Sequence, residues 1–170
     1  AFAAALGVSP WQLVSEANAQ TAAEIAQAGE LGDMALGSKD APVTIIEYAS
    51  MTCPHCAAFT KDVFPQIKTN YIDTGKVKVV HRDFPLAMHP LAKPMAMAVE
   101  CAHDQGNSQA QGMYDAVFAN QETGAPTAAS IPEWAKAVTG LNFDTWKTCY
   151  DGNNVVVNGA MAGAGTVGGG

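Results

Sequence analysis

Charged residues are scarce in this sequence, and basic residues are the scarcest. Nine lysine and arginine residues are scattered singly along 170 residues, and the formal net charge is −7. A protein that binds a nucleic-acid backbone needs a stripe or patch of basic side chains, so we expect no nucleic-acid partner. Hydrophobic residues make up 48% of the chain, which excludes a disordered protein and suffices for the core of one ordinary domain.

The N-terminal part lacks the length of a membrane-spanning helix. Residues 1–14 are apolar and uncharged, but they fall short of the ~20 apolar residues that span a bilayer. Ala17-Asn18-Ala19 fits a signal-peptidase site, although the basic start of an export signal is missing. The segment is therefore either part of an export signal or an alanine-rich helix, over about residues 10–28. The first interpretation predicts an exported, periplasmic protein, membrane-associated if residues 1–32 are retained.

Cysteine is also rare, and the four cysteines form two unlike pairs. Cys53 and Cys56 are separated by two residues, whereas Cys101 and Cys149 are 48 positions apart. A zinc site usually gathers four ligands as two close pairs, and His55 would complete at most a poor site. Zinc remains the weaker alternative at this point, and we expect neither a metal nor another cofactor.

The first half of the sequence alternates between strand and helix patterns. Residues 43–49 are apolar and rich in β-branched side chains, and residues 77–81 repeat this strand pattern. Between them, a helix is predicted, with Pro65 expected to kink it. Its apolar residues recur every four positions, at Phe59, Val63, Ile67 and Tyr71. Strand, helix and strand in this order predict a βαβ unit in a parallel sheet.

The sequence after Pro90 contains only helix patterns, through about residue 165. Ser130-Ile131-Pro132-Glu133 has the form of a capping box and is expected to open one helix. The apolar stripes comprise Leu91, Met95, Val99 and Ala102; Met113, Val117 and Phe118; and Phe143, Trp146 and Tyr150. We therefore predict an α/β chain in which a βαβ core is joined to a helical section.

The segment Cys53-Pro54-His55-Cys56 follows a predicted strand and opens a predicted helix. Pro54 suits the first helical position, which places Cys53 at the N-cap. Free backbone N–H groups and the helix dipole favour a thiolate there, so we expect a lowered pKa for Cys53. Cys56 lies one turn deeper. This arrangement predicts a redox pair in which Cys53 is attacked and Cys56 resolves, with a merely structural disulfide as the alternative.

His55 lies between the two cysteines and is expected to adjust their chemistry. A histidine titrates near neutral pH, so it can place a positive charge or a hydrogen bond beside the Cys53 sulfur. Stabilising the thiolate stabilises the reduced form and makes the disulfide more oxidising. His81, His89 and His103 show no partner pattern, and we expect them to be surface or core-satisfied histidines.

Residues 47–59, which read EYASMTCPHCAAF, resemble the active-site stretch of the DsbA family of periplasmic thiol oxidases. Proteobacterial members read E-[FY]-x-S-x-x-C-P-H-C there, and residues 39–44 (KDAPVT) and 82–86 (RDFPL) are also similar. The resemblance implies a thioredoxin-like fold with an inserted helical domain. The implied boundaries are a lead at 1–32, a core at 33–87, an insert at 88–150 and a return to the core at 151–170.

The resemblance also implies roles for single residues. The family places a buried acid at the position of Glu47, where a carboxylate could shuttle the proton of Cys56; a strand-end charge facing water is the alternative. Members with a second cysteine pair use it as a structural bridge, which implies a disulfide between Cys101 and Cys149. The implied function is the oxidation of reduced or unfolded exported proteins, followed by reoxidation by a membrane partner.

One departure from the family concerns the cis-proline loop that faces the active-site cysteines. No proline follows Pro132, and the strands expected after such a loop are missing. We therefore expect the natural gene to continue past Gly170. If it does not, an accessory subunit of a larger envelope complex is the alternative to an oxidase. A disulfide isomerase or reductase is the alternative within the same chemistry.

Overall fold

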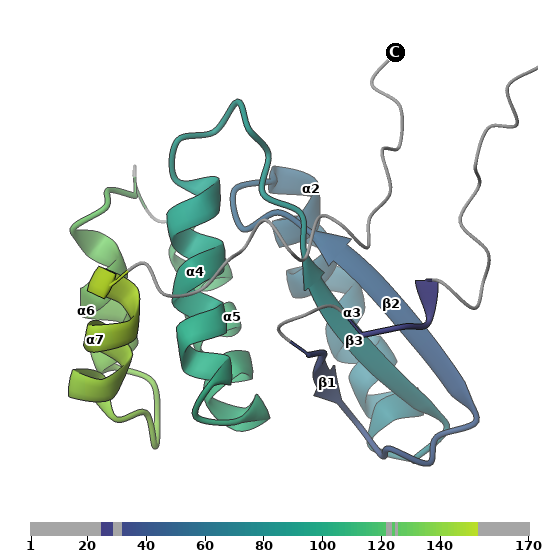
Figure 1. Ribbon diagram of the computed structural model, residues 1–170. Helices are drawn as coiled ribbons and strands as arrows, with labels where there is room; N and C mark the ends of the chain where they lie inside the picture. Colours follow the sequence, from purple (N-terminus) through teal and green to yellow (C-terminus); the bar gives the residue numbers. More distant parts are fainter. Residues whose placement is uncertain (1–24, 29–31, 122–123, 125, 153–170) are drawn as a thin grey trace, which may run out of the picture.

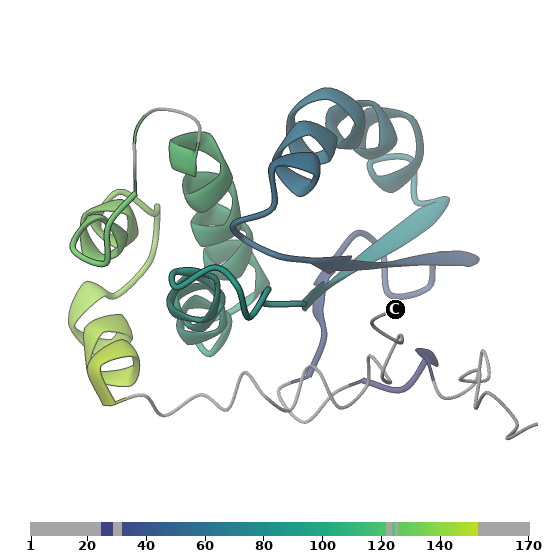
Figure 2. The same ribbon diagram turned by 90° about the horizontal axis from the view of Figure 1, so that it is seen from above.

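The computed structural model describes residues 25–28, 32–121, 124 and 126–152. Most of the expected lead helix at 10–28 and nearly all of the segment at 151–170 lie outside these residues. A small sheet lies on one side of the molecule, and the helix that follows its second strand covers one face of it (Figure 1, Figure 2). The four helices that follow the last strand in the chain lie beside the sheet. The α/β class predicted from the sequence is confirmed.

The sheet has three strands in the order β1-β3-β2. Strand β2 (Val43–Ala49) pairs with β3 (Val77–Asp83) in parallel, as predicted, and β1 (Met34–Leu36) pairs with β3 antiparallel. The central strand β3 continues two residues beyond its predicted end and is almost wholly buried. The β2–β3 register places Glu47 opposite His81, which brings two polar side chains together inside the fold.

The helix between β2 and β3 is not a regular α-helix. It runs as α2 (Pro54–Ala58), the π-helical turn η2 (Phe59–Val63), α3 (Phe64–Ile67) and the π-helical turn η3 (Lys68–Ile72). The irregularity expected at Pro65 is therefore a π turn that ends just before this residue.

The predicted four-residue stripe on this helix is wrong at two positions. Val63 and Tyr71 are 44% and 49% exposed, whereas Phe64 and Ile72 are only 7% and 5% exposed. A π turn contains more residues than an α turn, so the buried face moves one position along the chain after each of them. The sequence periodicity assumed α-helical turns throughout and therefore missed this shift.

The helical section consists of α4 (Ala92–His103), α5 (Asn107–Gln121), α6 (Ser130–Lys136) and α7 (Phe143–Gly152). Its core confirms the predicted stripes of α4 and α5. The fully buried Trp146 of α7 donates a hydrogen bond from Nε1 to the carbonyl oxygen of Ala98, 2.8 Å away. The buried stripe residues include Met95, Val99, Ala102, Met113, Val117 and Phe118.

The predicted capping box at the start of α6 is wrong. Ala129 is the N-cap, so Ser130 already lies within the helix and caps nothing. The Ser130 hydroxyl instead accepts the backbone N–H of Thr127, at 3.2 Å. Glu133 pairs with Lys136 on the helix surface, at 2.8 Å. Because the helix begins one residue earlier than the pattern suggests, the serine faces back onto the preceding loop.

A disulfide joins the two distant cysteines. Cys101 on α4 and Cys149 on α7 are bonded, with their Cα atoms 5.8 Å apart. The loop that the bond closes contains α5 and α6, so it restrains most of the helical section. Cys101 is 1% exposed and lies in the same apolar cluster as Trp146.

Replacing Cys101 and Cys149 together by serine should destabilise the protein by about 4 kcal/mol, because the unfolded chain then regains the entropy of a loop of this length. Urea unfolding of the double variant, compared with the parent protein, measures the difference. Both proteins should carry Cys53→Ser and Cys56→Ser, so that no other thiol can exchange. Equal free energies of unfolding would show that the bond does not stabilise this section.

Candidate active site at the Cys53–Cys56 pair

The chain turns sharply between the end of β2 and the start of α2. The backbone N–H of Cys53 donates to the carbonyl oxygen of Ser50, at 3.0 Å, and closes this turn. Cys53 is the N-cap of α2 and Pro54 occupies the first turn, as the sequence predicts. The Cys53 carbonyl then accepts the backbone N–H of Ala57, at 3.1 Å, which starts the helical hydrogen-bond pattern. The Cys53 side chain therefore lies where the first N–H groups of a helix have no intrahelical partner.

The loop that follows β3 supports this turn from behind. A hydrogen bond of 2.8 Å joins the Thr52 hydroxyl to Nδ1 of His89, and another of 3.0 Å joins it to the Ser50 hydroxyl. The Ser50 oxygen also accepts the backbone N–H of Leu86, at 3.4 Å. His89 is thus a satisfied histidine, as expected, but its place directly beside the cysteine turn was not predicted.

The two thiols, both free in the structure, have opposite electrostatic environments. Partial burial pushes the pKa of Cys53 up, but hydrogen bonds from the Cys56 backbone, the Cys56 side chain and the His55 backbone outweigh it, so the pKa is lowered. Burial raises the pKa of Cys56 to about 11, with smaller upward contributions from Cys53 and the Glu47 charge. The hydrogen bonds at the start of α2 therefore favour the thiolate form of Cys53, whereas burial favours the thiol form of Cys56.

His55 is exposed on α2, and only its backbone takes part in this balance. Its N–H group helps to lower the pKa of Cys53, as any residue at this position could do. The expected contribution of the imidazole ring to the redox couple therefore remains a prediction.

Glu47 faces the interior beneath the cysteines, with its side chain 14% exposed. Its Oε2 atom lies 2.6 Å from Nδ1 of His81, and the Tyr114 hydroxyl donates to the same oxygen at 3.3 Å. The carboxylate is close enough to raise the pKa of Cys56. The residue thus occupies an interior position suited to the proton chemistry expected of it, and it does not face water.

Sequence reasoning missed His81 and Tyr114 as neighbours of this acid. The parallel pairing of the two predicted strands could have revealed His81, because Glu47 and His81 lie opposite each other in the register. Tyr114 comes from α5, 67 positions from Glu47, and lies next to the predicted apolar stripe of that helix. Nothing local in the sequence connects it to the cysteine motif.

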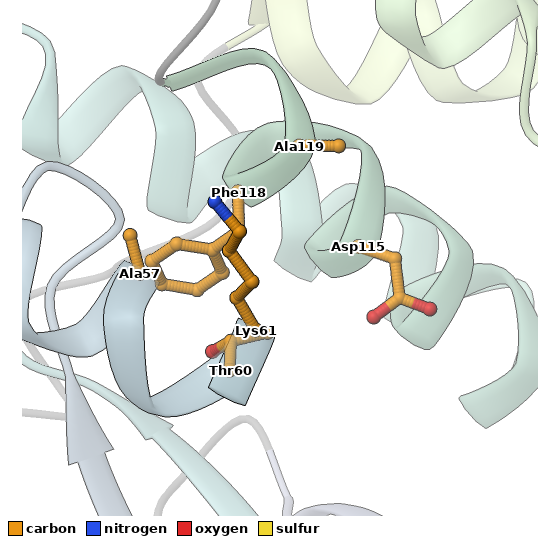
Figure 3. Close-up of a pocket in the computed structure, with 6 residues that line it drawn as sticks. All are labelled: Ala57, Thr60, Lys61, Asp115, Phe118 and Ala119. Carbon is orange, nitrogen blue, oxygen red and sulfur yellow. The ribbon is translucent and has the colours of Figure 1, made fainter. Parts of the chain in front are cut away.

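An open pocket of about 380 Å³ lies beside the active-site helix, between this helix and α5 (Figure 3). Its mainly apolar walls include Ala57, the residue after Cys56, and the ring of Phe118. Figure 3 shows the Lys61 and Asp115 side chains reaching from opposite helices. The full lining consists of Ala57, Thr60, Lys61, Asp115, Phe118 and Ala119.

Within the part of the chain that the structure describes, no three histidine, cysteine, aspartate or glutamate side chains are grouped so that they could hold a metal ion. Over the same residues, no helix combines the length and apolar character that crossing a membrane requires.

Comparison with known proteins places the site in context. A family model described as thioredoxin matches residues 30–152. The chain is similar to a putative protein-disulfide oxidoreductase of Rickettsia bellii, with 50% identity over 52 residues, covering 31% of this chain and 20% of that protein. It is also similar to disulfide bond formation protein D of Bacillus subtilis, with 47% identity over 47 residues, covering 28% and 21%. The match thus spans about a fifth of the length of these curated relatives.

Solved structures match over a larger part of the chain. Oxidised BdbD from Bacillus subtilis is 25% identical, with a TM-score of 0.65, covering 78% of this chain and 72% of that one. The structure of α-DsbA1 from Wolbachia pipientis is 29% identical, with a TM-score of 0.65, covering 79% and 67%.

The difference between the two thiols predicts different behaviour for two serine variants. Cys56→Ser should accumulate a mixed disulfide with oxidised glutathione, because the Cys53 thiolate attacks the glutathione disulfide, one glutathione leaves as a thiolate, and no second thiol releases the adduct. Cys53→Ser should accumulate little, because burial raises the pKa of the remaining thiol and disfavours its thiolate. Intact-mass measurement after equal incubation compares them. Equal adduct formation in both variants would refute the assigned order of attack.

Proposed function

We propose a function for this chain, which belongs to the DsbA-like members of the thioredoxin family. In this proposal it is a thiol–disulfide oxidoreductase that introduces disulfides into exported proteins through Cys53 and Cys56. The observation that carries the proposal is the opposite pKa shift of the two thiols at one helix N-terminus. Names of relatives, such as disulfide bond formation protein D, support the same chemistry.

The proposed reaction begins with the Cys53–Cys56 disulfide. A substrate thiolate attacks the Cys53 sulfur, a bond forms between them, and the Cys53–Cys56 bond breaks. Cys56 leaves with the electron pair and takes up a proton, because burial disfavours its thiolate. A second substrate thiolate then attacks the substrate sulfur of the mixed disulfide, and Cys53 leaves as a thiolate. The substrate loses two electrons and gains a disulfide, and the enzyme is reduced to its dithiol.

The site favours the oxidising direction because it stabilises one product of the reaction. Hydrogen bonds from the start of α2 favour the Cys53 thiolate, which is present only in the reduced enzyme. A more stable reduced form makes the disulfide a stronger oxidant. This reasoning favours an oxidase over a reductase or an isomerase, and the comparisons do not favour an accessory subunit.

The remaining residues take supporting roles in the proposal. Glu47 exchanges the proton of Cys56 from below, and the imidazole of His55 stabilises the Cys53 thiolate from the exposed side. The Cys101–Cys149 disulfide ties α4 to α7 within the helical insert of residues 88–150 and so keeps the shape of this insert beside the core of residues 33–87. The proposed location is the periplasm, the substrates are reduced or unfolded exported proteins, and a membrane partner restores the active-site disulfide.

An assay of substrate oxidation tests the proposal. The oxidised protein should convert a peptide with two cysteines to its disulfide at least ten times faster than oxidised glutathione at the same concentration, because Cys53 is the better leaving group. The Cys101→Ser/Cys149→Ser variant should keep the rate, whereas Cys53→Ser should abolish it. A wild-type rate no higher than that of glutathione would contradict the oxidase. Activity confined to reshuffling of wrongly paired disulfides would indicate an isomerase instead.

A further inference from the structure

Tyr114 brings a polar group from the helical insert to the acid beneath the redox pair. The residue lies on α5 and is 1% exposed, yet its hydroxyl reaches Glu47 Oε2, 3.3 Å away. Its ring lies 4.5 Å from the His81 ring and 4.7 Å from the Phe118 ring, centroid to centroid. Burial, and next the charge of Glu47, raise the pKa of Tyr114 above its ordinary range, so the hydroxyl stays protonated and donates.

The hydrogen bonds of Glu47 are distributed unevenly between its two oxygens. His81 and Tyr114 both contact Oε2, and within the described residues no protein group is hydrogen-bonded to Oε1. Nε2 of His81 is buried and has no hydrogen-bond partner among those residues. A proton on Nε2 would be a buried donor without an acceptor, so the geometry favours a proton on Nδ1, where the carboxylate accepts it. Two donors, from His81 and Tyr114, therefore hold one oxygen of the carboxylate.

The titratable groups that act on Glu47 come from three elements. Cys56 faces it from α2, His81 from β3 and Tyr114 from α5, and Asp115, the next residue of α5, lies near His81. Burial raises the pKa of Asp115, and the hydrogen bond that Gln111 donates to this carboxylate opposes the shift. The charges of Glu47 and Cys56 both raise the pKa of Tyr114, so the thiol, the acid and the phenol are close enough to interact electrostatically.

We propose that Tyr114 is a positioning residue: it fixes Glu47 Oε2 so that Oε1 serves the Cys56 sulfur, and thereby makes proton exchange at Cys56 depend on the helical insert. The inference rests on the proposed oxidoreductase function. When Cys56 resolves a mixed disulfide, its S–H proton passes to Oε1, and its thiolate forms a bond to the Cys53 sulfur. The bond from Cys53 to the partner sulfur breaks, and the partner leaves as a thiolate. In substrate oxidation the proton moves in the opposite direction.

Tyr114→Phe tests the role because it removes one donor and keeps the ring. The measurement is the release of glutathione from the Cys53–glutathione mixed disulfide across a range of pH. We expect release to slow by about tenfold, because the carboxylate is no longer held with Oε1 toward the Cys56 sulfur. The acid limb of the profile should move to higher pH, because the charged carboxylate that accepts the proton has lost a donor. Tyr150→Phe, on α7, is the matched control and should behave as wild type.

A double variant separates positioning from packing. In a Glu47→Gln background, Tyr114→Phe should cause no further slowing, since the carboxylate it acts through is gone. Equal slowing in both backgrounds, or a Tyr114→Phe profile identical to that of Tyr150→Phe, would overturn the inference. If Tyr114→Phe does not fold, 3-fluorotyrosine keeps the ring and strengthens the donor, so the acid limb should move to lower pH. An unmoved limb would again overturn it.

The same experiment distinguishes this inference from the function on which it rests. A wild-type protein that forms no mixed disulfide with oxidised glutathione refutes the proposed function and the inference together. A wild-type protein that exchanges normally, with an unaffected Tyr114→Phe variant, refutes the inference alone.

Discussion

The hydrogen bonds at the start of helix α2 determine which of the two sulfur atoms can carry negative charge. Backbone N–H groups in the first turn of a helix have no intrahelical acceptor, and Cys53 lies at the N-cap beside them. They lower the pKa of Cys53 even though partial burial opposes the shift. Every functional conclusion about this protein depends on that local balance, and β2, the Ser50 turn and Pro54 together hold the sulfur in place.

Cys56 is only three residues away, yet its surroundings have the opposite effect. Burial disfavours its thiolate, and the Glu47 charge adds to the penalty. A thiol that resists ionisation must exchange its proton before it attacks and after it leaves, so an acid below it has a chemical purpose. His81 from the sheet and Tyr114 from the insert both bond to this acid. β3 and α5 therefore meet at Glu47, the acid that we propose exchanges the proton of Cys56.

The features that the sequence predicted well depend on short-range patterns. The β-branched run at 43–49 is β2, the motif from Cys53 to Cys56 opens a helix, and the apolar stripes of α4 and α5 are buried. In each case, neighbours in the chain provide the determining contacts. The resemblance to the DsbA family added the thioredoxin-like fold, which the periodicity alone could not specify.

The features that the sequence did not predict depend on small shifts in phase or on distant contacts. Two π turns move the buried face of the active-site helix, so Phe64 and Ile72 replace Val63 and Tyr71 in the core. A helix start one residue early removes the cap expected of Ser130. The hydroxyl of Tyr114 donates to Glu47, although the two residues are 67 positions apart in the sequence. Only the three-dimensional packing of α5 beside the active site reveals this contact.

A pH titration of the two thiols in the reduced protein tests the central claim most directly, with thiolate formation followed by ultraviolet absorbance. The account predicts two separate steps: Cys53 ionises below the ordinary pKa of a cysteine, and Cys56 ionises at about 11. Below the first step Cys53 is protonated, so its reaction with disulfides should slow as the pH falls through that step. Cys53→Ser should remove the lower step, and Cys56→Ser should remove the upper one. Two thiols that ionise together near the ordinary value would contradict the account.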